Sequence, residues 1–330
     1  MNPTPRVPFL SGIKPTGDLH LGNYFGAIQQ FINLHQQHQD GMVMIADMHA
    51  LNQMHDAEAL QASIKTTLLG YLACGLDPKK VSIFQQSAVI EHVELATVLG
   101  ALCPLGLMER AHAYKDALAN GKEANVGLFT YPILMAADIL LYKPAGVPVG
   151  KDQQQHVEIA IDLSEKFNHT YSPVFPEPRL LLQADTAIVP GTDGRKMSKS
   201  YGNVIGLLYT EVEVAKKVAT IVTDSRGPAE AKDPDTCNIF ALHRLVGTAQ
   251  ELAELDKDYR SGSISYKGSK DLLAMRINRF LQPIRERHEE LVKDPSYLEK
   301  VLVDGSKRAK EIAGETMAEV REAAGLILHW

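Results

Sequence analysis

The pattern of hydrophobic and polar residues divides the chain into two parts. In the first part, short apolar runs typical of strands alternate with stretches of helical periodicity. This alternation predicts a doubly wound, Rossmann-like parallel sheet with helices on both faces, and ligands of such sheets bind at the carboxyl ends of the strands. The predicted strands are residues 6–13, 42–46, 81–85 and 148–150, and the predicted helices are residues 22–38, 57–74, 91–102 and 152–167.

The pattern changes after about Gly206, where long helical stretches follow without a convincing strand. We therefore predict an α/β catalytic domain over residues 1–205 and a smaller all-helical domain over residues 206–330, whose last helices could fold back onto the first domain. Residues 191–202 between them are rich in Gly, Ser and Lys, which predicts a mobile loop. The helices expected in the second part are residues 211–222, 238–247, 250–259, 270–293 and 295–324.

Composition narrows the class of protein. The chain has 330 residues, of which 45% are hydrophobic and 22% charged, so it can bury a core and is not a disordered or fibrous protein. Cys74, Cys103 and Cys237 lie too far apart for a Cys-x-x-Cys pair, which argues against a cysteine-ligated metal site. No signal peptide and no apolar run of roughly 20 residues is found, so we expect a cytoplasmic protein that does not bind a membrane.

The distribution of charge leaves two interpretations open. The formal net charge of −6 argues against a general polyanion-binding protein, and we expect no DNA partner. Residues 267–310, however, carry 11 basic and 7 acidic side chains. This segment could form a basic face for one nucleic acid, or equally an ordinary solvated helical surface.

The first segment with candidate chemistry is residues 11–23, predicted as a strand, a glycine turn and the start of a helix. Gly12 and Gly17 allow a ligand to approach the backbone closely, and the helix start offers unpaired amides to a phosphate. His20 and Asn23 are three residues apart, hence on one face, where both can donate to a nucleotide. A single histidine is more often structural, so this segment alone is only suggestive.

The second segment is Lys-Met-Ser-Lys-Ser at residues 196–200. Two ammonium groups on one loop can close over a triphosphate and neutralise the charge that develops on departing pyrophosphate. A Lys/Ser-rich loop is usually an exposed linker. The two segments together are far more specific than either alone.

Together the two segments resemble the paired signature motifs of class I aminoacyl-tRNA synthetases. The first motif, usually His-x-Gly-His, has here the variant His-Leu-Gly-Asn at residues 20–23, which is similar to tryptophanyl-tRNA synthetases. Residues 46–50, 130–142, 147–158 and 222–225 also resemble that family in order and spacing, and the resemblance covers about residues 11–325. It implies a ligase that activates L-tryptophan with ATP, releases pyrophosphate, and transfers the tryptophanyl group to tRNA(Trp).

The resemblance assigns roles to individual residues. His20 and Asn23 are expected to contact the phosphates, and Lys196 and Lys199 to stabilise the transition-state charge. Mg²⁺ is expected to accompany ATP, with no metal site made by protein side chains. The ATP-binding residues that it implies are Lys14, Pro15, Thr16, Gly22, Asn23, Gly150, Lys151, Asp152, Ile188, Lys196, Met197, Ser198, Lys199 and Ser200.

Four positions depart from the common pattern of the family. Lys14 stands where glutamine is usual and Lys151 where an acidic residue is usual, while Ala113 and Ala117 replace glutamine and lysine. The departures concern how ATP is held and leave the reaction unchanged. One hypothesis is that Lys14 or Lys115 takes over a phosphate contact.

Asp138 is the candidate for amino-acid specificity. It is the only charged residue in positions 128–142, so an ionised Asp138 in this apolar stretch needs a partner. An indole N–H only donates and a carboxylate only accepts, so a tryptophan substrate would match, whereas an internal salt bridge or cap is the alternative. The resemblance implies tryptophan binding by Asp138, Met135, His49 and Gln153.

The resemblance also implies a homodimer in which tRNA bridges the subunits. Arg276, Arg279, Arg285 and Arg287 in the helical part are the candidates for contact with the anticodon. Alternative functions are a tyrosyl-type synthetase, a nucleotidyltransferase or other adenylate-forming enzyme, and a non-catalytic paralogue that binds tRNA or tryptophan. A small adenylate-forming enzyme would not need the long helical part.

Overall fold

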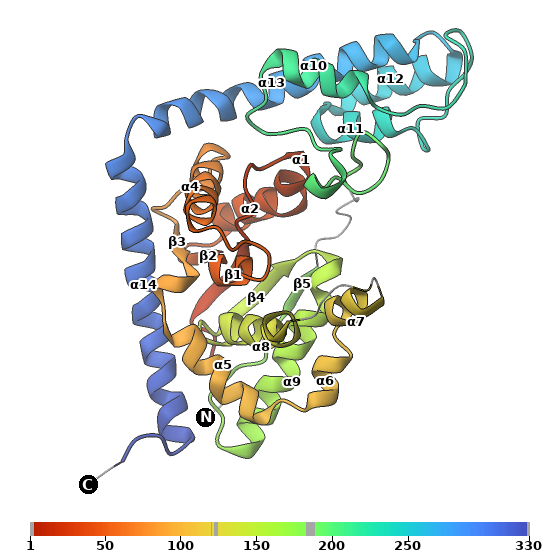
Figure 1. The fold of residues 1–330 in the computed structure, drawn as a ribbon. Coiled ribbons are helices and arrows are strands. Elements are labelled where there is room, and N and C mark those ends of the chain that lie inside the picture. The colour runs from red at the N-terminus through yellow and green to blue at the C-terminus, as the bar shows by residue number, and fades with distance from the viewer. Residues whose placement is uncertain (1–2, 120, 122–124, 183–188, 329–330) are drawn as a thin grey trace.

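A parallel sheet of five strands forms the centre of the first part of the molecule (Figure 1). The computed structural model describes residues 3–119, 121, 125–182 and 189–328. Neighbouring strands pair in parallel in the order β3-β2-β1-β4-β5, which confirms the predicted doubly wound fold. The strands are β1 (Val7–Ile13), β2 (Gly41–Ile45), β3 (Val81–Gln85), β4 (Pro144–Val149) and β5 (Leu180–Leu182).

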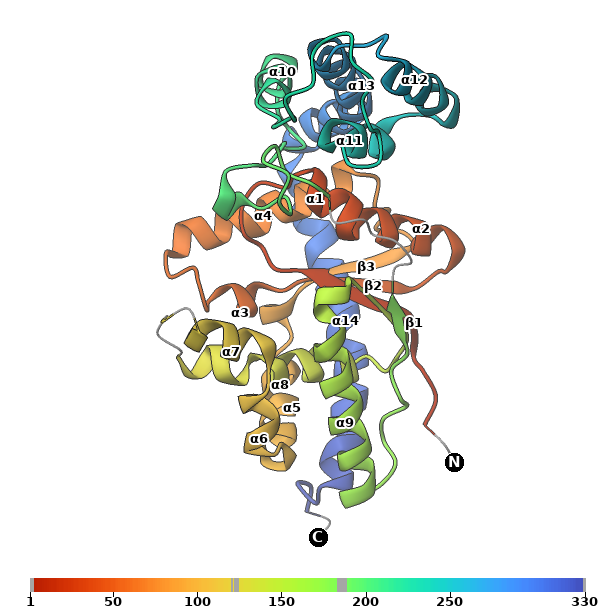
Figure 2. The same cartoon turned by 90° about the vertical axis from the view of Figure 1, so that its right-hand side faces the viewer.

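Helices cover both faces of the sheet, as Figure 2 shows with the sheet seen edge-on. One face packs against α1, α2 and α4, and the other against α5, α8 and α9. All five residues of β2 are buried, because this strand lies inside the sheet with apolar layers on both sides. The helices of this part are α1 (Leu21–Asn23), α2 (Gln29–Gln37), α3 (Asp47–Ala50), α4 (Ala57–Ala73), α5 (Glu91–Leu102), α6 (Leu105–Glu109), α7 (His112–Ala119), α8 (Val126–Leu140) and α9 (Gln154–Thr170).

Several elements differ from the sequence prediction. Helices α3, α6, α7 and α8 are absent from the predicted set. The helix expected at residues 22–38 contains a π-helical turn, η1 (Tyr24–Ile28), between α1 and α2. Strand β4 begins at Pro144 rather than at residue 148, and β5 was not predicted. The first residues of β4 are hard to predict because the strand contains two prolines, which are uncommon in strands. Strand β5 is hard to predict because it has only three residues.

Helices α10 to α13 form a cluster beyond the sheet, above it in Figure 1, and α14 follows them in the chain. Local capping fixes two of them: Thr210 with Glu213 begins α10, and Thr248 with Glu251 begins α12, in each case through a capping box. The domain boundary at residues 205/206 stays a prediction. The helices are α10 (Glu211–Ala219), α11 (Asn238–Val246), α12 (Ala249–Ser261), α13 (Tyr266–Val292) and α14 (Pro295–Ala323).

Helix α14 leaves the helical cluster and runs down the side of the sheet along β3 (Figure 1). The two elements touch at Gly305, where an added Cβ would lie only 1.9 Å from the Ile83 carbonyl oxygen. The Gln85 backbone N–H donates to Ser306 Oγ (3.3 Å). Because β3 is an outer strand, α14 covers an edge that would otherwise expose unpaired backbone groups.

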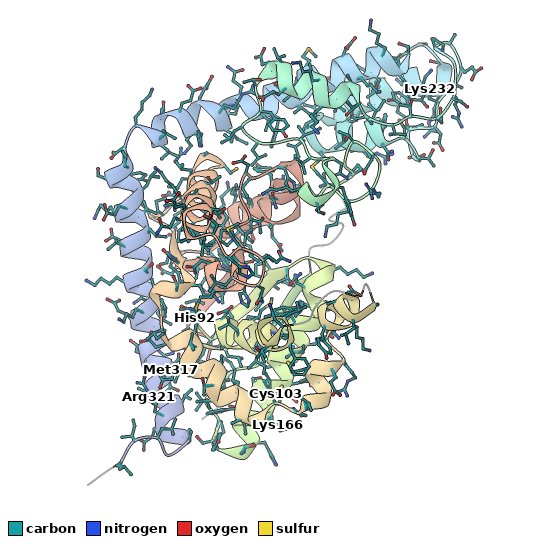
Figure 3. The ribbon with its side chains drawn as sticks, in the orientation of Figure 1. His92, Cys103, Lys166, Lys232, Met317 and Arg321 are labelled. Atoms are coloured by element: carbon teal, nitrogen blue, oxygen red, sulfur yellow. The ribbon has the colours of Figure 1, made fainter. Side chains whose placement is uncertain are left out.

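The last turns of α14 are tied to the first part by ion pairs. Arg321 forms a two-point pair with Glu94 of α5, with contacts of 2.7 and 2.5 Å, and Figure 3 shows Arg321 and Met317 on this end of the helix. Glu319 accepts from Lys143 Nζ (2.8 Å) and also pairs with Arg6. Within the described residues, no helix is long and apolar enough to cross a membrane.

Candidate active site at the carboxyl ends of the strands

Two groups of predicted ATP-binding residues lie at the carboxyl ends of β1 and β4, where the strand order reverses. Lys14, Pro15 and Thr16 follow β1, while Gly150 and the 3₁₀ turn η3 (Lys151–Gln153) follow β4, the neighbour of β1. Open α/β sheets bind ligands at this position. Lys14 Nζ donates to Gln53 Oε1 (3.0 Å), and partial burial lowers the pKa of the Lys14 ammonium.

The first motif forms a glycine turn and a helix start. Gly17 has a φ of 91°, in the left-handed region that favours glycine. The His20 backbone N–H donates to Asn23 Oδ1 (3.0 Å), so Asn23 fixes the start of α1. Burial, and then the charge of Lys199, lower the pKa of His20 to about 4. His20 is therefore neutral at pH 7 and can donate from one ring nitrogen.

The second motif lies directly on this turn. Lys199 Nζ donates to the Thr16 carbonyl (2.8 Å), and the two chain segments pair through Leu21 N–H to Ile205 O (3.0 Å) and Leu207 N–H to Leu19 O (2.9 Å). Burial lowers the pKa of the Lys199 ammonium, and the charge of Asp18 opposes that shift. The structure therefore brings His20, Asn23 and Lys199 together.

The lysine motif is not an open loop in this structure. Residues 189–197 fold back as a hairpin, with Met197 N–H on Val189 O (2.9 Å) and Gly191 N–H on Arg195 O (2.7 Å). The 3₁₀ turn η4 (Lys199–Tyr201) follows. The Met197 side chain is buried in the core near Gly22, so it is unavailable to a nucleotide, and the predicted ATP contact does not involve that side chain.

Asp138 on α8 is almost fully buried, with 2% of its surface exposed, and has three protein partners. Gln86 Nε2 donates to both carboxylate oxygens (2.8 and 3.0 Å), His49 Nε2 lies 2.7 Å from Oδ2, and His92 Nδ1 lies 2.6 Å from Oδ1. Burial alone would raise the pKa of Asp138, but the two histidines outweigh burial and hold it well below its ordinary value. The internal partners considered as an alternative for Asp138 are thus present.

The partners of Asp138 come from different elements, and sequence reasoning missed two of them. Gln86, in the turn η2 (Gln86–Ala88) at the end of β3, is fully buried and accepts the Met48 N–H (3.0 Å) with its Oε1. His92 on α5, labelled in Figure 3, also bonds the Tyr142 hydroxyl through Nε2 (2.8 Å). The rule that ligands bind at strand ends could have identified Gln86, but His92 carried no such signal.

A side chain that sequence reasoning did not single out stands beside His49. Tyr131 of α8 meets the His49 ring edge-on, with centroids 6.1 Å apart, and its hydroxyl bonds His156 of α9. Burial raises the pKa of Tyr131 to about 12, so the phenol keeps its proton. His49 is the partner of Asp138 that reaches the surface, with 12% of its side chain exposed.

The remaining predicted residues have varied positions. Met135 is half-buried against the core around α8, Gln153 N–H bonds Gly150 O (2.9 Å), and Ser198 and Ser200 hydroxyls lie 3.0 Å apart. Ile188 and the side chain of Asp152 lie outside the described residues. In the described part of the chain, no group of three or more His, Cys, Asp or Glu residues could hold a metal ion.

The arginines expected to face an anticodon are mostly engaged within the protein. Arg276 is buried and bonds His243 Nδ1 (2.9 Å), so its predicted contact with tRNA is wrong. Arg279 forms a two-point pair with Glu251 (2.8 and 2.9 Å), and Arg285 donates to the Tyr209 carbonyl (2.8 Å). These three arginines of α13 therefore contact α11, α12 and the segment before α10.

Comparisons with known proteins agree with these motifs. The family model of class I tRNA synthetases for tryptophan and tyrosine (W and Y) matches residues 2–282. The tryptophan–tRNA ligase of Fusobacterium nucleatum is 46% identical over 96% of this chain and 98% of its own length, and that of Thermotoga maritima is 38% identical over 96% and 99%.

Solved structures add the fold. The tryptophanyl-tRNA synthetase of Campylobacter jejuni, crystallised with ADP and tryptophan, superimposes with a TM-score of 0.88 at 41% identity, covering 96% of this chain and 99% of that one. A tyrosyl-tRNA synthetase from Archaeoglobus fulgidus reaches a TM-score of 0.65 at 22% identity, which shows the shared fold. The chain belongs to the class I tRNA synthetases for tryptophan and tyrosine and, within them, to the tryptophan–tRNA ligases.

Proposed function

We propose that the chain attaches L-tryptophan to tRNA(Trp) in two steps at the carboxyl ends of β1 and β4. The observation that carries the proposal is the contact between the two motifs, in which Lys199 Nζ lies against the Thr16 carbonyl of the glycine turn. The chain is similar to tryptophan–tRNA ligases over nearly its full length, which supports the interpretation of this contact as part of an ATP site. The same juxtaposition would place cationic groups around a triphosphate seated on the turn.

In the first step, a carboxylate oxygen of tryptophan attacks the α-phosphorus of ATP in line. The bond from that phosphorus to its bridging oxygen breaks, and pyrophosphate leaves with the bonding electrons. Little proton transfer is needed, so positioning and charge stabilisation dominate. We assign His20 and Asn23 to the phosphates and Lys196 and Lys199 to the charge on pyrophosphate. Mg²⁺ enters as part of the substrate Mg·ATP.

Tryptophan selection is assigned to Asp138, with His49, Met135 and Gln153 around the substrate. Three donor atoms of the protein lie within reach of the Asp138 carboxylate, and Gln86 Nε2 shares its contact between both oxygens. The indole N–H would be a further donor to this group, which only accepts. Phenylalanine lacks this donor, and sites built to hydrogen-bond a substrate N–H or O–H reject such analogues by roughly 10⁴-fold or more.

In the second step, a ribose hydroxyl of the terminal tRNA nucleotide attacks the adenylate carbonyl, and AMP leaves with formation of the ester. The proposal includes a homodimer that shares the tRNA and a cytoplasmic location. The dimer rests on the family relationship, and the location on the three cysteines, none of which forms a disulfide. Light scattering of the purified protein would measure the oligomeric state.

The testing experiment is ATP–pyrophosphate exchange with each of the twenty amino acids, followed by charging of purified tRNA(Trp). We expect exchange with tryptophan and formation of tryptophanyl-tRNA. Exchange with tyrosine instead would identify a tyrosyl-type enzyme. Absence of exchange would identify a non-catalytic paralogue, and exchange without tRNA charging would identify a different adenylate-forming enzyme.

A further inference from the structure

We propose that Asn203 is a positioning residue for the lysine motif, one that sets the geometry of Lys196–Lys199 for the activation step without touching a substrate. The inference rests on the proposed function and extends it to a residue outside the motif. Asn203 follows η4 and exposes only 2% of its surface.

The Asn203 amide bonds the motif through both of its ends. Its Nδ2 donates to the Lys196 carbonyl (3.1 Å), and its Oδ1 accepts the Ser198 backbone N–H (2.8 Å). Ser198 and Lys199 are adjacent, so the second bond fixes the backbone directly before the lysine that rests on Thr16. One buried side chain thus holds the backbone at two points of a five-residue motif.

The same amide is itself held by the hairpin that precedes the motif. Asn203 Nδ2 also donates to Asp193 Oδ1 (2.6 Å), and the Thr192 N–H donates to the Asn203 carbonyl (3.0 Å). Asp193 is fixed by Arg195, whose backbone N–H (3.0 Å) and Nε (2.8 Å) both donate to it. An added Cβ on Gly191 would lie 2.1 Å from Asn203 Nδ2, so the side chain fills its site completely.

The positions of the Lys196 and Lys199 ammonium groups therefore depend on the hydrogen bonds of the neutral Asn203 side chain. Displacement of a catalytic group by about 1 Å can reduce the rate about 10²-fold, even when no substrate contact is lost. The residues assigned to tryptophan lie on α3, α8 and η3, and none of the hydrogen bonds of Asn203 described above reaches these elements. Loss of the Asn203 bonds should therefore affect turnover and leave tryptophan binding nearly unchanged.

The test is Asn203→Ala in tryptophan-dependent ATP–pyrophosphate exchange, with the concentration of active enzyme determined by titration of the adenylate burst. We expect kcat per active site to fall about 10²-fold, with KM for tryptophan within about twofold of wild type. An unchanged kcat in the folded variant would overturn the inference.

The matched control is Asn168→Ala at the end of α9. Asn168 also makes three loop hydrogen bonds, to Val174 N, Phe175 N and Phe175 O (2.9, 3.0 and 2.7 Å), but far along the chain from the motif. We expect a lower Tm and an unchanged kcat. Equal losses of kcat in both variants would show that Asn203 contributes only to stability, and would overturn the inference.

Should Asn203→Ala fail to fold, Asp193→Ala removes the anchor of the amide from a partly exposed turn. We expect about a tenfold lower kcat with unchanged KM for tryptophan, and an unchanged kcat would overturn the inference. Wild-type enzyme without any tryptophan-dependent exchange would refute the proposed function and this inference with it. Active wild type with a fully active variant refutes the inference alone.

Discussion

Asp138 is a buried charge with protein partners on three sides, and we propose that it also selects the substrate. His49, Gln86 and His92 hold the carboxylate ionised, because their donors and charges outweigh the cost of burial. The sequence alone singled out Asp138 as a candidate, since it is the one charge in an apolar stretch. Its contact with Gln86, which lies 52 residues away in the chain, forms only in the folded sheet, and no local pattern predicts that contact.

Asp138→Asn should weaken tryptophan binding selectively. The amide replaces an acceptor by a donor that faces other donors, which costs about 1–3 kcal/mol for the unsatisfied group. We expect KM for tryptophan to rise about 10²-fold in pyrophosphate exchange and the preference over phenylalanine to shrink. Asp162→Asn, on the exposed side of α9, is the control. Unchanged KM and unchanged preference would remove Asp138 from the specificity site.

Lys199→Ala should act on the rate instead. Removal of one charge donor at a developing negative charge typically costs about 10²–10³ in rate, while the residues that we propose for tryptophan binding are different ones. Pre-steady-state measurement of adenylate formation gives the rate, and KM for tryptophan should change little. Lys166→Ala on α9, which Figure 3 shows away from the carboxyl ends of the strands, should keep wild-type activity. An unchanged rate for Lys199→Ala would contradict the assigned role.

At the scale of elements, hydrophobic periodicity predicted the bounds correctly for segments whose structure follows from their own sequence. Strand β3 and helix α5 have the predicted bounds, residues 81–85 and 91–102. The basic stretch in α13 misled the prediction, because charge alone does not reveal that Arg276 points into the helical cluster. The sequence analysis allows the last helices to fold back onto the first domain, and α14 does contact β3. Which strand it covers depends on contacts between distant segments, which no local pattern encodes.

Two glycines of α14 provide a test of this packing. Alanine is favoured over glycine in a helix by about 1 kcal/mol, so Gly314→Ala, where nothing lies within 4 Å of the new Cβ, should stabilise the protein. Gly305→Ala brings a Cβ to 1.9 Å from the Ile83 oxygen and should lower the free energy of unfolding by about 1–3 kcal/mol. Urea unfolding measures both variants. Equal stabilisation by both would show that α14 does not lie on β3.

At the scale of the whole molecule, buried histidines link stability to pH. Burial first, and then the charge of Arg276, lower the pKa of His243 to about 4 from 6.5. His20 is shifted in the same direction to about 4. The unfolded chain binds these protons more readily, so their contribution to stability is complete above pH 6.5 and is lost as the pH falls toward 4.

His243→Gln should therefore flatten the fall of stability in acid. The variant loses the bond to Arg276 and is less stable at pH 7.5, but its urea midpoint should decrease less than that of wild type between pH 6.5 and 4.5. His38→Gln, at an exposed position after α2, should follow the wild-type curve. Parallel curves for His243→Gln and wild type would contradict the predicted linkage.

The order of the strands has a consequence for biosynthesis. β3 is followed directly by Gln86, yet its outer edge is covered by α14, which comes later in the chain than every strand of the sheet. A nascent chain that has already assembled β1 to β5 would present a bare strand to its neighbours until α14 emerges. Chaperone protection during that interval, and intolerance of C-terminal truncation, follow from this topology.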